Sequence, residues 1–386
     1  MAYANLGEKL KETGGLRNQL KTIRTRLGIS QQDLANSAGV ARQTIGGIEA
    51  ELYSPSAAVA LRLARALGCR VEEVFWLSDS ETRIEAISAG PIASDNDVRV
   101  ALAPVGGRWI AHPLVGEHAF QMQMAPADGI GTPVAGSEKL SVRLLDDPET
   151  LARTVAIAGC TPVLSLWARS AERWHPGLRV HWTHANSMKA LGSLARREVH
   201  AAGIHLYDAV TQEFNVPFVR LAISGCAVTI VNLGIWEEGL IVQPGNPKGL
   251  RTCADLATPG VRLVNREAGA GSRLLLDSAL DATGVCKSAI AGYDRTVGSH
   301  QEVASAVARD LADVGVSTAA VAAIYGLNFI AIRKVRYDLA ILEEYMHLEP
   351  IRQLLSTLEH RWVRSQLEVL GGYDTTHTGA ATTIEP

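Results

Sequence analysis

One stretch of this chain, Gln31–Ala50, restricts the possible folds more than any other. Ser30 can cap a helix that begins with the stretch, and Leu34 and Ala35 then lie on the inner face of that helix. Gly39 follows where the backbone needs a left-handed turn, a conformation that glycine adopts without a steric penalty. The pattern predicts a short capped helix that ends in a tight turn.

A second helix is predicted directly after Gly39. Val40, Ile45 and Ile48 recur at a spacing that places all three on one helix face. The small side chain of Ala35 and the turn glycine let the two helices cross closely at a steep angle. This combination predicts a helix-turn-helix, the motif whose second helix enters the major groove of DNA.

Length and composition describe the rest of the chain in outline. With 386 residues, we expect two or three domains, and 47% apolar and 20% charged residues are typical of globular proteins. No apolar run reaches the roughly 18 residues that cross a membrane. Residues 1–15 lack the apolar core of a signal peptide, so we expect a cytoplasmic protein with no membrane partner.

Charge and cysteine usage narrow the function classes. Residues 1–78 carry a net charge of +3 and the remainder −6, so the basic excess lies with the helix-turn-helix. The net negative charge of the larger C-terminal part does not favour binding to nucleic acid. The five cysteines are scattered, odd in number and form no C-x-x-C pair, which favours reduced thiols over a disulfide framework or a zinc site.

Further helices are expected around the motif. Apolar residues at helical spacing predict a first helix over residues 16–27, Pro55-Ser56 begins a fourth helix that ends before Gly68, and residues 71–77 can form a fifth. This plan resembles the XRE-type, phage-repressor-like DNA-binding domains over about residues 14–77. The matching residues are Ser30-Gln31, Leu34-Ala35, Gly39-Val40, Arg42-Gln43-Thr44-Ile45, Ile48-Glu49 and Pro55-Ser56.

The resemblance implies roles for individual residues. The residue at Gln31 would brace the DNA backbone, and those at Arg42, Gln43 and Thr44 would face the groove. Arginine can bind the two acceptors of guanine, and glutamine can pair with adenine. The resemblance also implies an ion pair between Arg24 and Glu49.

Two departures from the family pattern affect the second helix. Ala41 stands where a capping Ser or Thr is usual, which weakens the helix start by roughly 0.5–2 kcal/mol. Gly46-Gly47 inside the helix adds a cost of about 2 kcal/mol relative to alanine. We therefore expect base reading to concentrate in residues 42–44, with either modest specificity or a close backbone approach at Gly47.

A small β-rich segment is expected next. Residues 78–97 are polar and contain Gly90-Pro91, which is typical of a linker. Residues 98–103 and 109–114 flank Gly106-Gly107 and predict a β-hairpin, and shorter strand-like pieces surround residues 120–124 and 140–145.

From Thr154 the pattern changes to alternating strands and helices in two successive halves. Residues 227–233 and 240–242 are expected to flank a turn, residues 329–333 and 337–342 to form separate strands, and helices to finish the chain. The predicted fold class is multidomain: an all-α helix-turn-helix domain over residues 1–78, a linker and β-rich connector over 79–150, and a two-lobed α/β domain over 151–386.

The α/β part resembles the type-II periplasmic binding proteins, and most closely the molybdate-binding-protein-like sensor domains that bacteria fuse to DNA-binding modules. The resemblance covers roughly residues 150–375. It is carried by the motifs AGCTPVLSLWA, HANSMKAL, AGIHLYD, GNPKG, VNREAGAGSR and ADVGV.

Three predicted helix starts follow strand ends in this part. Free backbone N–H groups and the helix dipole favour an anion at such a position, and ligands of open α/β sheets lie beyond the carboxyl ends of strands. Hydroxyls, amides and one or two arginines would complete a cage for an anion. The candidate ligand-binding residues are Cys160, Thr161, Asn186, Ser187, Arg266, Gly271, Ser272 and Arg273.

The resemblance favours a tetrahedral oxyanion such as molybdate or tungstate, and a small organic acid is the alternative. Cys160 at a helix start suggests a nucleophile, which would make the protein a DNA-bound enzyme, but no base is identifiable beside it in the sequence. His181 and His184 are closely spaced on a predicted strand without a further ligand. We therefore expect no catalytic residue, no metal and no cofactor.

These observations together predict a one-component transcription regulator rather than an enzyme. Its partners would be double-stranded DNA, a small anion and a second copy of the chain in a homodimer. Closure of the two lobes on the ligand would change the spacing of two DNA-binding domains.

Overall fold

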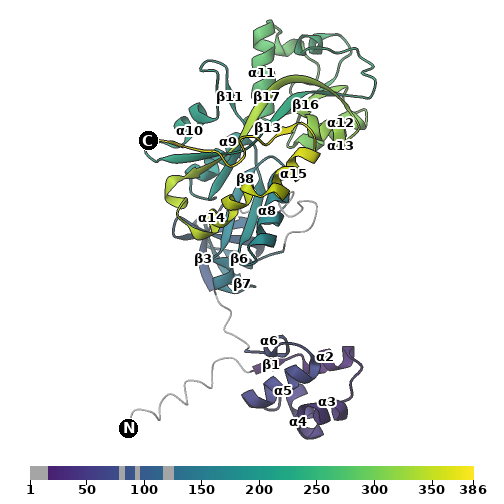
Figure 1. The fold of residues 1–386 in the computed structure, drawn as a ribbon, viewed down its shortest axis with the longest axis vertical. Coiled ribbons are helices and arrows are strands. Elements are labelled where there is room, and N and C mark those ends of the chain that lie inside the picture. Colours follow the sequence, from purple (N-terminus) through teal and green to yellow (C-terminus); the bar gives the residue numbers. More distant parts are fainter. Residues whose placement is uncertain (1–15, 78–82, 92–95, 116–125) are drawn as a thin grey trace. The chain divides into compact units, whose positions relative to one another are not determined.

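The computed structural model describes residues 16–77, 83–91, 96–115 and 126–386, and the chain divides into two compact units. The first unit ends at Thr82 and the second runs from Arg83 to Pro386 (Figure 1). Among the described residues, no helix combines the length and the apolar character that crossing a membrane requires.

The first unit is a helical domain closed by a short two-stranded sheet. Its core contains Leu20, Leu34, Ile45, Ile48 and Leu63, all of them buried. The elements are β1 (Leu16–Asn18), α2 (Leu20–Arg26), α3 (Gln31–Ala38), α4 (Arg42–Glu49), α5 (Ala57–Leu67), α6 (Val71–Val74) and β2 (Phe75–Leu77).

The predicted helix boundaries inside this unit are confirmed. The Ser30 side chain accepts a hydrogen bond from the Asp33 N–H at the start of α3, and Gly39 ends that helix with a φ of 64°. Ser56 caps α5 in the same way, and Gly68 ends it with a φ of 69°.

The two outer helices were predicted too long. Residues 16–18 form β1, which pairs antiparallel with β2, so the first helix begins only at Leu20 and the last ends at Val74. The Asn18 side chain accepts a hydrogen bond from the Leu20 N–H, which separates the strand from the helix. Tertiary pairing of two distant segments overrides the helical spacing here.

The second unit begins with a closed five-stranded barrel. Its strands are β3 (Arg83–Ser88), β4 (Val98–Val105), β5 (Arg108–Pro113), β6 (Gly129–Pro133) and β7 (Lys139–Leu144). The predicted hairpin is confirmed as β4 and β5. The expected linker contains β3, which pairs with β5 and β7, so that part of the expectation is wrong. The strand-like piece at residues 120–124 lies outside the described residues.

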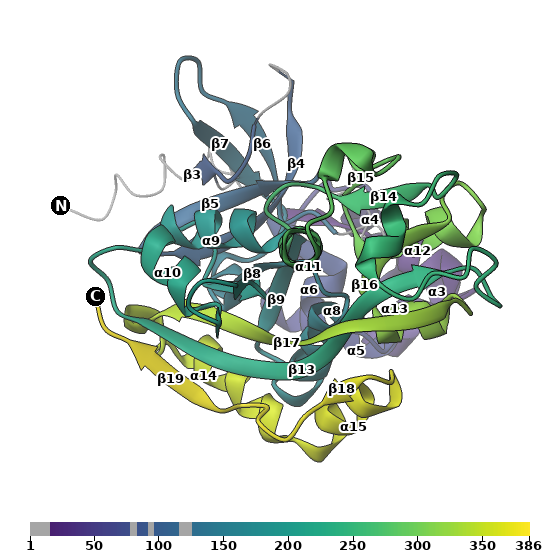
Figure 2. The same ribbon diagram turned by 90° about the horizontal axis from the view of Figure 1, so that it is seen from above.

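A large sheet organises the two lobes that follow. Its main path is β15-β14-β16-β13-β17-β10-β8-β9, and β13 (Val228–Val242) and β17 (Asn328–Leu342) are its two longest strands. Figure 2 shows these two strands side by side along the sheet. They belong to both lobes, because β17 also pairs with β10 of the first lobe and β13 with β16 of the second.

Each long strand was predicted as two shorter ones, which is wrong. The β13–β17 pairing continues past Gly234 and Gly239, with a register shift next to each glycine. A Cβ atom on Gly239 would lie 2.1 Å from the Ile330 carbonyl oxygen, so the glycine allows the close approach of the partner strand.

Helices pack on both faces of each lobe. The first lobe has β8 (Thr154–Gly159), α8 (Val163–Trp174), β9 (Arg179–His184), α9 (Ser187–Ala195), β10 (Ala201–Ile204) and α10 (Val216–Ala222), and the pair β11 (Tyr207–Asp208) and β12 (Glu213–Phe214) follows β10. The second lobe has β14 (Leu263–Arg266), α11 (Gly271–Thr283), β15 (Thr296–Val297), α12 (His300–Ala308), β16 (Val314–Thr318) and α13 (Ala319–Ile324).

The chain ends in strands rather than in the expected helices. After α14 (Glu349–Ser356) and α15 (Arg361–Val369), β18 (Tyr373–Asp374) and β19 (Ala381–Ile384) both pair with β13. The Trp167 indole N–H donates to the Thr357 hydroxyl at 2.8 Å and ties α8 to this C-terminal segment.

Candidate functional site

The second helix of the helix-turn-helix is α4, and it presents three polar side chains at its start. Arg42 and Gln43 are exposed and Thr44 is half-buried. Ala41 precedes them in an extended conformation and supplies no side-chain cap, as the sequence predicts. An exposed arginine and glutamine on the first turn of such a helix have the chemistry to read base edges.

The expected ion pair between Arg24 and Glu49 is confirmed. The Arg24 guanidinium donates to both carboxylate oxygens of Glu49, at 2.6 and 3.2 Å, and Gln31 donates to one of them at 2.8 Å. Burial works against the charge of Glu49, but the hydrogen bonds from Arg24 and Gln31 outweigh it and lower the pKa of this carboxyl. The start of α3 and the end of α4 are thereby fixed to α2.

Gly47 is explained by packing inside the unit. The residue is buried, and a Cβ atom there would lie 2.4 Å from the Tyr53 ring. Tyr53 covers this turn of α4 and donates to the Thr44 carbonyl at 3.2 Å. The missing side chain at Gly47 therefore has a packing reason inside the unit, and the two alternatives for DNA reading, modest specificity or a close backbone approach, stay predictions.

In the second unit, four of the eight candidate ligand-binding residues lie around one residue, His205. The Cys160 sulfur lies 3.2 Å from its Nε2 atom, and the Ser187 hydroxyl accepts a hydrogen bond from its backbone N–H at 3.2 Å. Gly271 packs so closely that a Cβ atom would lie 2.1 Å from the His205 carbonyl oxygen. Ser272 reaches the same place through Glu238, to which it donates at 3.2 Å.

We call Cys160, His205, Glu238, Ser272 and His300 the buried cluster. Each of these residues is at most 3% exposed, although four of the five carry strongly polar groups. Cys160 and His205 come from the first lobe, Ser272 and His300 from the second, and Glu238 from the long strand β13 that belongs to both. The cluster therefore joins the two lobes at the carboxyl ends of their strands, where ligands of such sheets bind.

Three of these side chains form a row. The Glu238 carboxylate lies 3.2 Å from Nδ1 of His205, whose Nε2 faces the Cys160 sulfur. Burial alone would lower the pKa of His205, but the charges of Cys160 and Glu238 and the contacts with them raise it to about 10. The expectation that no base lies beside Cys160 is wrong, because 45 residues separate it from His205 in the sequence.

His300 and Arg266 lie on the second-lobe side. Burial, followed by the nearby charges of Arg266 and His205, holds the pKa of His300 well below its usual value, so this imidazole is neutral. Arg266 is 1% exposed and is held by Glu267 at 2.9 and 3.1 Å and by the Gly298 carbonyl at 2.9 Å. Its Nη1 atom is buried and has no hydrogen-bond partner within the described part of the chain.

The remaining candidates have structural contacts. The Thr161 hydroxyl accepts from the Val163 N–H at the start of α8. Asn186 caps α9 and also donates to Glu267 and to the Ala268 carbonyl, a bridge between the lobes. Arg273 donates to the Arg266 carbonyl at 3.1 Å, and its guanidinium lies 4.1 Å from the centre of the Tyr293 ring. The contacts of its charged group therefore lie outside the buried cluster.

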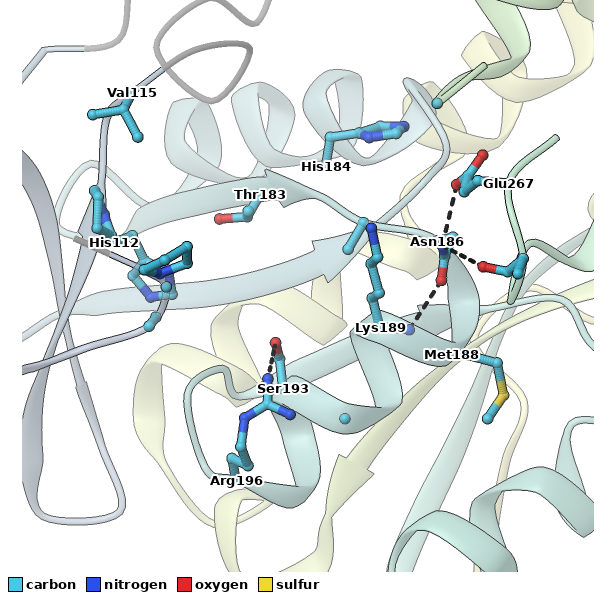
Figure 3. Close-up of a pocket in the computed structure, with 18 of the residues that line it drawn as sticks. His112, Val115, Thr183, His184, Asn186, Met188, Lys189, Ser193, Arg196 and Glu267 are labelled. Atoms are coloured by element: carbon cyan, nitrogen blue, oxygen red, sulfur yellow. Dashed lines mark hydrogen bonds between the residues drawn. The ribbon is translucent and has the colours of Figure 1, made fainter. Parts of the chain in front are cut away.

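An open pocket of about 870 Å³ adjoins this bridge. Figure 3 shows Asn186 reaching Glu267 at one end, His112 from the barrel at the other, and Lys189 and Arg196 between them. Of the eight candidate residues, only Asn186 lines the pocket. The other candidates are packed against protein atoms or lie in the buried cluster.

Sequence reasoning missed Glu238 and His300. Glu238 and its neighbour Glu237 are two acids in an otherwise apolar run, and charges at such a position are the signal that could have pointed to it. His300 stands directly after the cap Ser299, as the first residue of α12. The rings of His205 and Trp236 lie 5.4 Å apart at the buried cluster.

Known protein families match both parts of this architecture. A helix-turn-helix family model matches residues 20–74, and a model of the PBP superfamily domain matches residues 168–359. The chain is 41% identical over 64 residues to the uncharacterized HTH-type transcriptional regulator YgzD of Bacillus subtilis, covering 17% of this chain and 97% of that protein. The chain belongs to the helix-turn-helix transcriptional regulators.

The part of this helix-turn-helix regulator that contains the PBP-like domain also resembles known proteins. It is 31% identical over 197 residues to the uncharacterized protein YvgK of Bacillus subtilis, a match that spans 51% of this chain and 63% of that protein. Among solved structures, the chain is similar to a putative phosphate ABC transporter substrate-binding protein of Clostridium perfringens with bound phosphate. The TM-score is 0.45 at 14% identity, and the match covers 57% of this chain and 98% of that chain. The sulfate-binding protein SubI of Mycobacterium tuberculosis gives a TM-score of 0.43 at 16% identity, with coverage of 57% of this chain and 86% of that chain.

Proposed function

We propose that this protein is a one-component transcription regulator that binds operator DNA through residues 1–78 and a small anion through residues 151–386, with residues 79–150 as the connector. It acts in the cytoplasm as a homodimer. The membership of the helix-turn-helix regulators and the PBP-like domain support this division. The protein regulates by binding rather than by turnover.

DNA contact is assigned to the start of α4. Arg42 and Gln43 contact base edges, and Thr44 supports them. Gln31, which donates a hydrogen bond to Glu49, contacts the DNA backbone. Replacing Arg42 or Gln43 by Ala should cost about 1–3 kcal/mol at the matching base and relax the sequence preference there. Gel-shift titration on the protein's own upstream region, with each base pair varied, measures both quantities.

Arg65→Ala is the matched control, because it removes one exposed positive charge from α5 and leaves α4 intact. It should weaken binding about equally for all sequences. An unchanged sequence preference in both α4 variants would refute the groove assignment.

The ligand is a small anion held between the lobes, and the observation that carries this proposal is the buried Nη1 atom of Arg266. A guanidinium N–H with no partner in the interior is costly, and a bound anion supplies the missing acceptor. The start of α12 lies beside it, since the Gly298 carbonyl already accepts from Arg266. Tight packing limits the ligand to a few atoms, which fits a tetrahedral oxyanion such as molybdate or tungstate.

Calorimetric titration of the full chain with molybdate, tungstate, sulfate, phosphate and small carboxylates tests the proposal. At least one oxyanion should bind, and Arg266→Gln should lower its affinity about 10–100-fold, the usual value of a charge-assisted hydrogen bond. Arg262→Gln is the control, because this exposed arginine pairs with Asp313 at the surface. If only carboxylates bind, the ligand is a small organic acid and not an oxyanion. If no anion binds, the proposal is refuted.

The second candidate is a DNA-bound enzyme that uses Cys160. The row of Cys160, His205 and Glu238 favours it, because nucleophile, base and orienting acid follow in that order at 3.2 Å steps. Alkylation by iodoacetamide followed by peptide mass analysis distinguishes the two. A Cys160 that reacts faster than the exposed Cys286 supports the enzyme, and an inert Cys160 supports a regulator that only binds.

A further inference from the structure

Three side chains of the buried cluster have the composition of a transition-metal site. The ligand atoms of Cys160, His205 and His300 all lie within 4.8 Å of one another, and all three residues are buried. Tetrahedral zinc with one sulfur and two nitrogen ligands needs ligand–ligand distances of about 3.3–3.6 Å. The Cys160–His205 distance of 3.2 Å is slightly shorter than this range, and shifts of about 1 Å bring the third ligand into it.

The surroundings orient these ligands as metal sites require. Glu238 lies 3.2 Å from Nδ1 of His205, which leaves Nε2 of the same ring towards Cys160. This is the carboxylate–histidine–metal arrangement that fixes the tautomer and the orientation of a ligating imidazole. Trp236 and Tyr337 pack against the His205 ring at 5.4 and 5.8 Å and hold it in place.

His300 supplies an independent observation. Its Nε2 atom is buried and has no hydrogen-bond partner among the described residues, while Nδ1 faces the Ser317 hydroxyl at 3.4 Å. An imidazole held through one nitrogen, with the other aimed into a polar interior, is the usual state of a metal-binding histidine.

We propose that Cys160, His205 and His300 bind one divalent transition-metal ion of the zinc type. The thiolate and two imidazoles suit Zn²⁺ and its tetrahedral analogues over Mg²⁺ or Ca²⁺, which prefer oxygen ligands. The thiolate and the Glu238 carboxylate together balance the two charges of the ion. Three protein ligands leave a fourth position for water or for a small anion.

The position of the ligands gives the metal a role in lobe closure. Cys160 and His205 follow strands of the first lobe, and His300 begins α12 of the second. One ion bound to all three links the lobes directly. The sequence gives no hint of this set, because the three ligands stand on separate connections that follow β8, β10 and β15.

Titration of the chelator-treated full chain with Co²⁺ tests the proposal with the metal alone and no oxyanion present. A tetrahedral site should give visible ligand-field bands and a thiolate-to-cobalt charge-transfer band at one ion per chain, and Zn²⁺ should then displace the cobalt. Cys160→Ser should abolish the charge-transfer band. Glu238→Gln should retain the band with an affinity about 10–100-fold lower, as for the loss of other groups that orient a metal ligand.

Cys286→Ser is the matched control, because this exposed cysteine lies outside the cluster and should leave the band unchanged. Circular dichroism verifies that each variant is folded, and His300→Gln, which keeps the thiolate, should weaken binding without removing the sulfur band. Absence of the band in the wild type, or its persistence in Cys160→Ser, would overturn the assignment. Failure of the oxyanion titration leaves this result unaffected, since no anion is used.

Discussion

His200 joins the barrel to the first lobe through both nitrogens of one buried ring. Its Nδ1 accepts from the Ala156 N–H and its Nε2–H donates to the Pro104 carbonyl, each at 3.0 Å. The bond from the Ala156 N–H needs the neutral ring, because a proton on Nδ1 would leave this N–H without its acceptor. Burial accordingly lowers the pKa of His200 to about 4.

This residue predicts a pH dependence of stability. The unfolded chain binds a proton at His200 below about pH 6.5, whereas the folded chain binds it only below about pH 4, so stability falls as the pH drops through this window. Between about pH 7 and pH 5 the loss from this residue should be about 2 kcal/mol. Urea unfolding of the wild type and of His200→Gln at both pH values measures it.

The variant should show a pH slope smaller by about that amount, because glutamine retains a donor and an acceptor but does not titrate. Other titrating groups are common to both proteins and cancel in the difference. Equal slopes would contradict the assignment of a neutral, buried His200.

The structural roles of some single residues could be predicted from the sequence, and those of others could not. Ser30, Gly39, Ser56 and Gly68 were predictable because a cap or a left-handed turn depends on neighbours within four residues. The buried cluster was only half predictable. Cys160 and Ser272 could be found as helix-start residues, but their contacts with His205 and Glu238 depend on how distant strands are ordered in the sheet.

At the scale of elements, the start of α11 is placed against the first lobe with no spare volume. A Cβ atom on Gly271 would lie 2.1 Å from the His205 carbonyl and 2.5 Å from its ring. Backbone cannot move aside as the end of a long side chain can. The contact between lobes therefore requires glycine at the first residue of this helix.

Gly271→Ala should hold the lobes apart while each lobe still folds. Overpacking typically costs about 1–3 kcal/mol, so ligand affinity should fall about tenfold or more. Calorimetry with the anion identified for the wild type measures the affinity, and small-angle scattering reports the expected opening. Gly192→Ala in α9 is the control, because its nearest atom is the flexible end of Arg196 at 3.2 Å. Wild-type affinity in Gly271→Ala would show that closure does not depend on this contact.

Elements were predicted well where local signals decide and poorly where pairing decides. Ser30 and Ser56 predicted the starts of α3 and α5 to within a residue or two. The long strands were divided in error, because only their pairing with each other shows that β13 and β17 are continuous, with register shifts next to Gly234 and Gly239 in β13. Likewise β1, β2, β18 and β19 are short, and only their partner strands define them.

At the scale of the whole molecule, ligand binding and DNA binding should be linked. A ligand shifts the protein between two states only by the difference in its affinity for them. Coupling of this kind is typically worth about 1–3 kcal/mol, so operator affinity should change about 5–150-fold at saturating anion. Fluorescence anisotropy with labelled operator, with and without the anion, measures the change.

Arg266→Gln provides the control for this coupling, because it should bind operator normally and lose the response to the anion. An equal response in the variant and the wild type would place the effective anion elsewhere, including on the DNA-binding unit itself. The overall architecture was predictable because motifs of both domains are local in sequence, whereas the ligand depends on side chains that meet only in the folded lobes.

Glu238 occupies a particular place in β13, one of the two longest strands in the described part of the chain. The pairing of β13 with β17 changes register between Glu238 and Gly239, the point at which such a ribbon bends most readily. Any rotation of one lobe against the other thus displaces the carboxylate that touches His205 and Ser272. A substitution of Glu238 should therefore change the bending of this ribbon and the contacts of the buried cluster together.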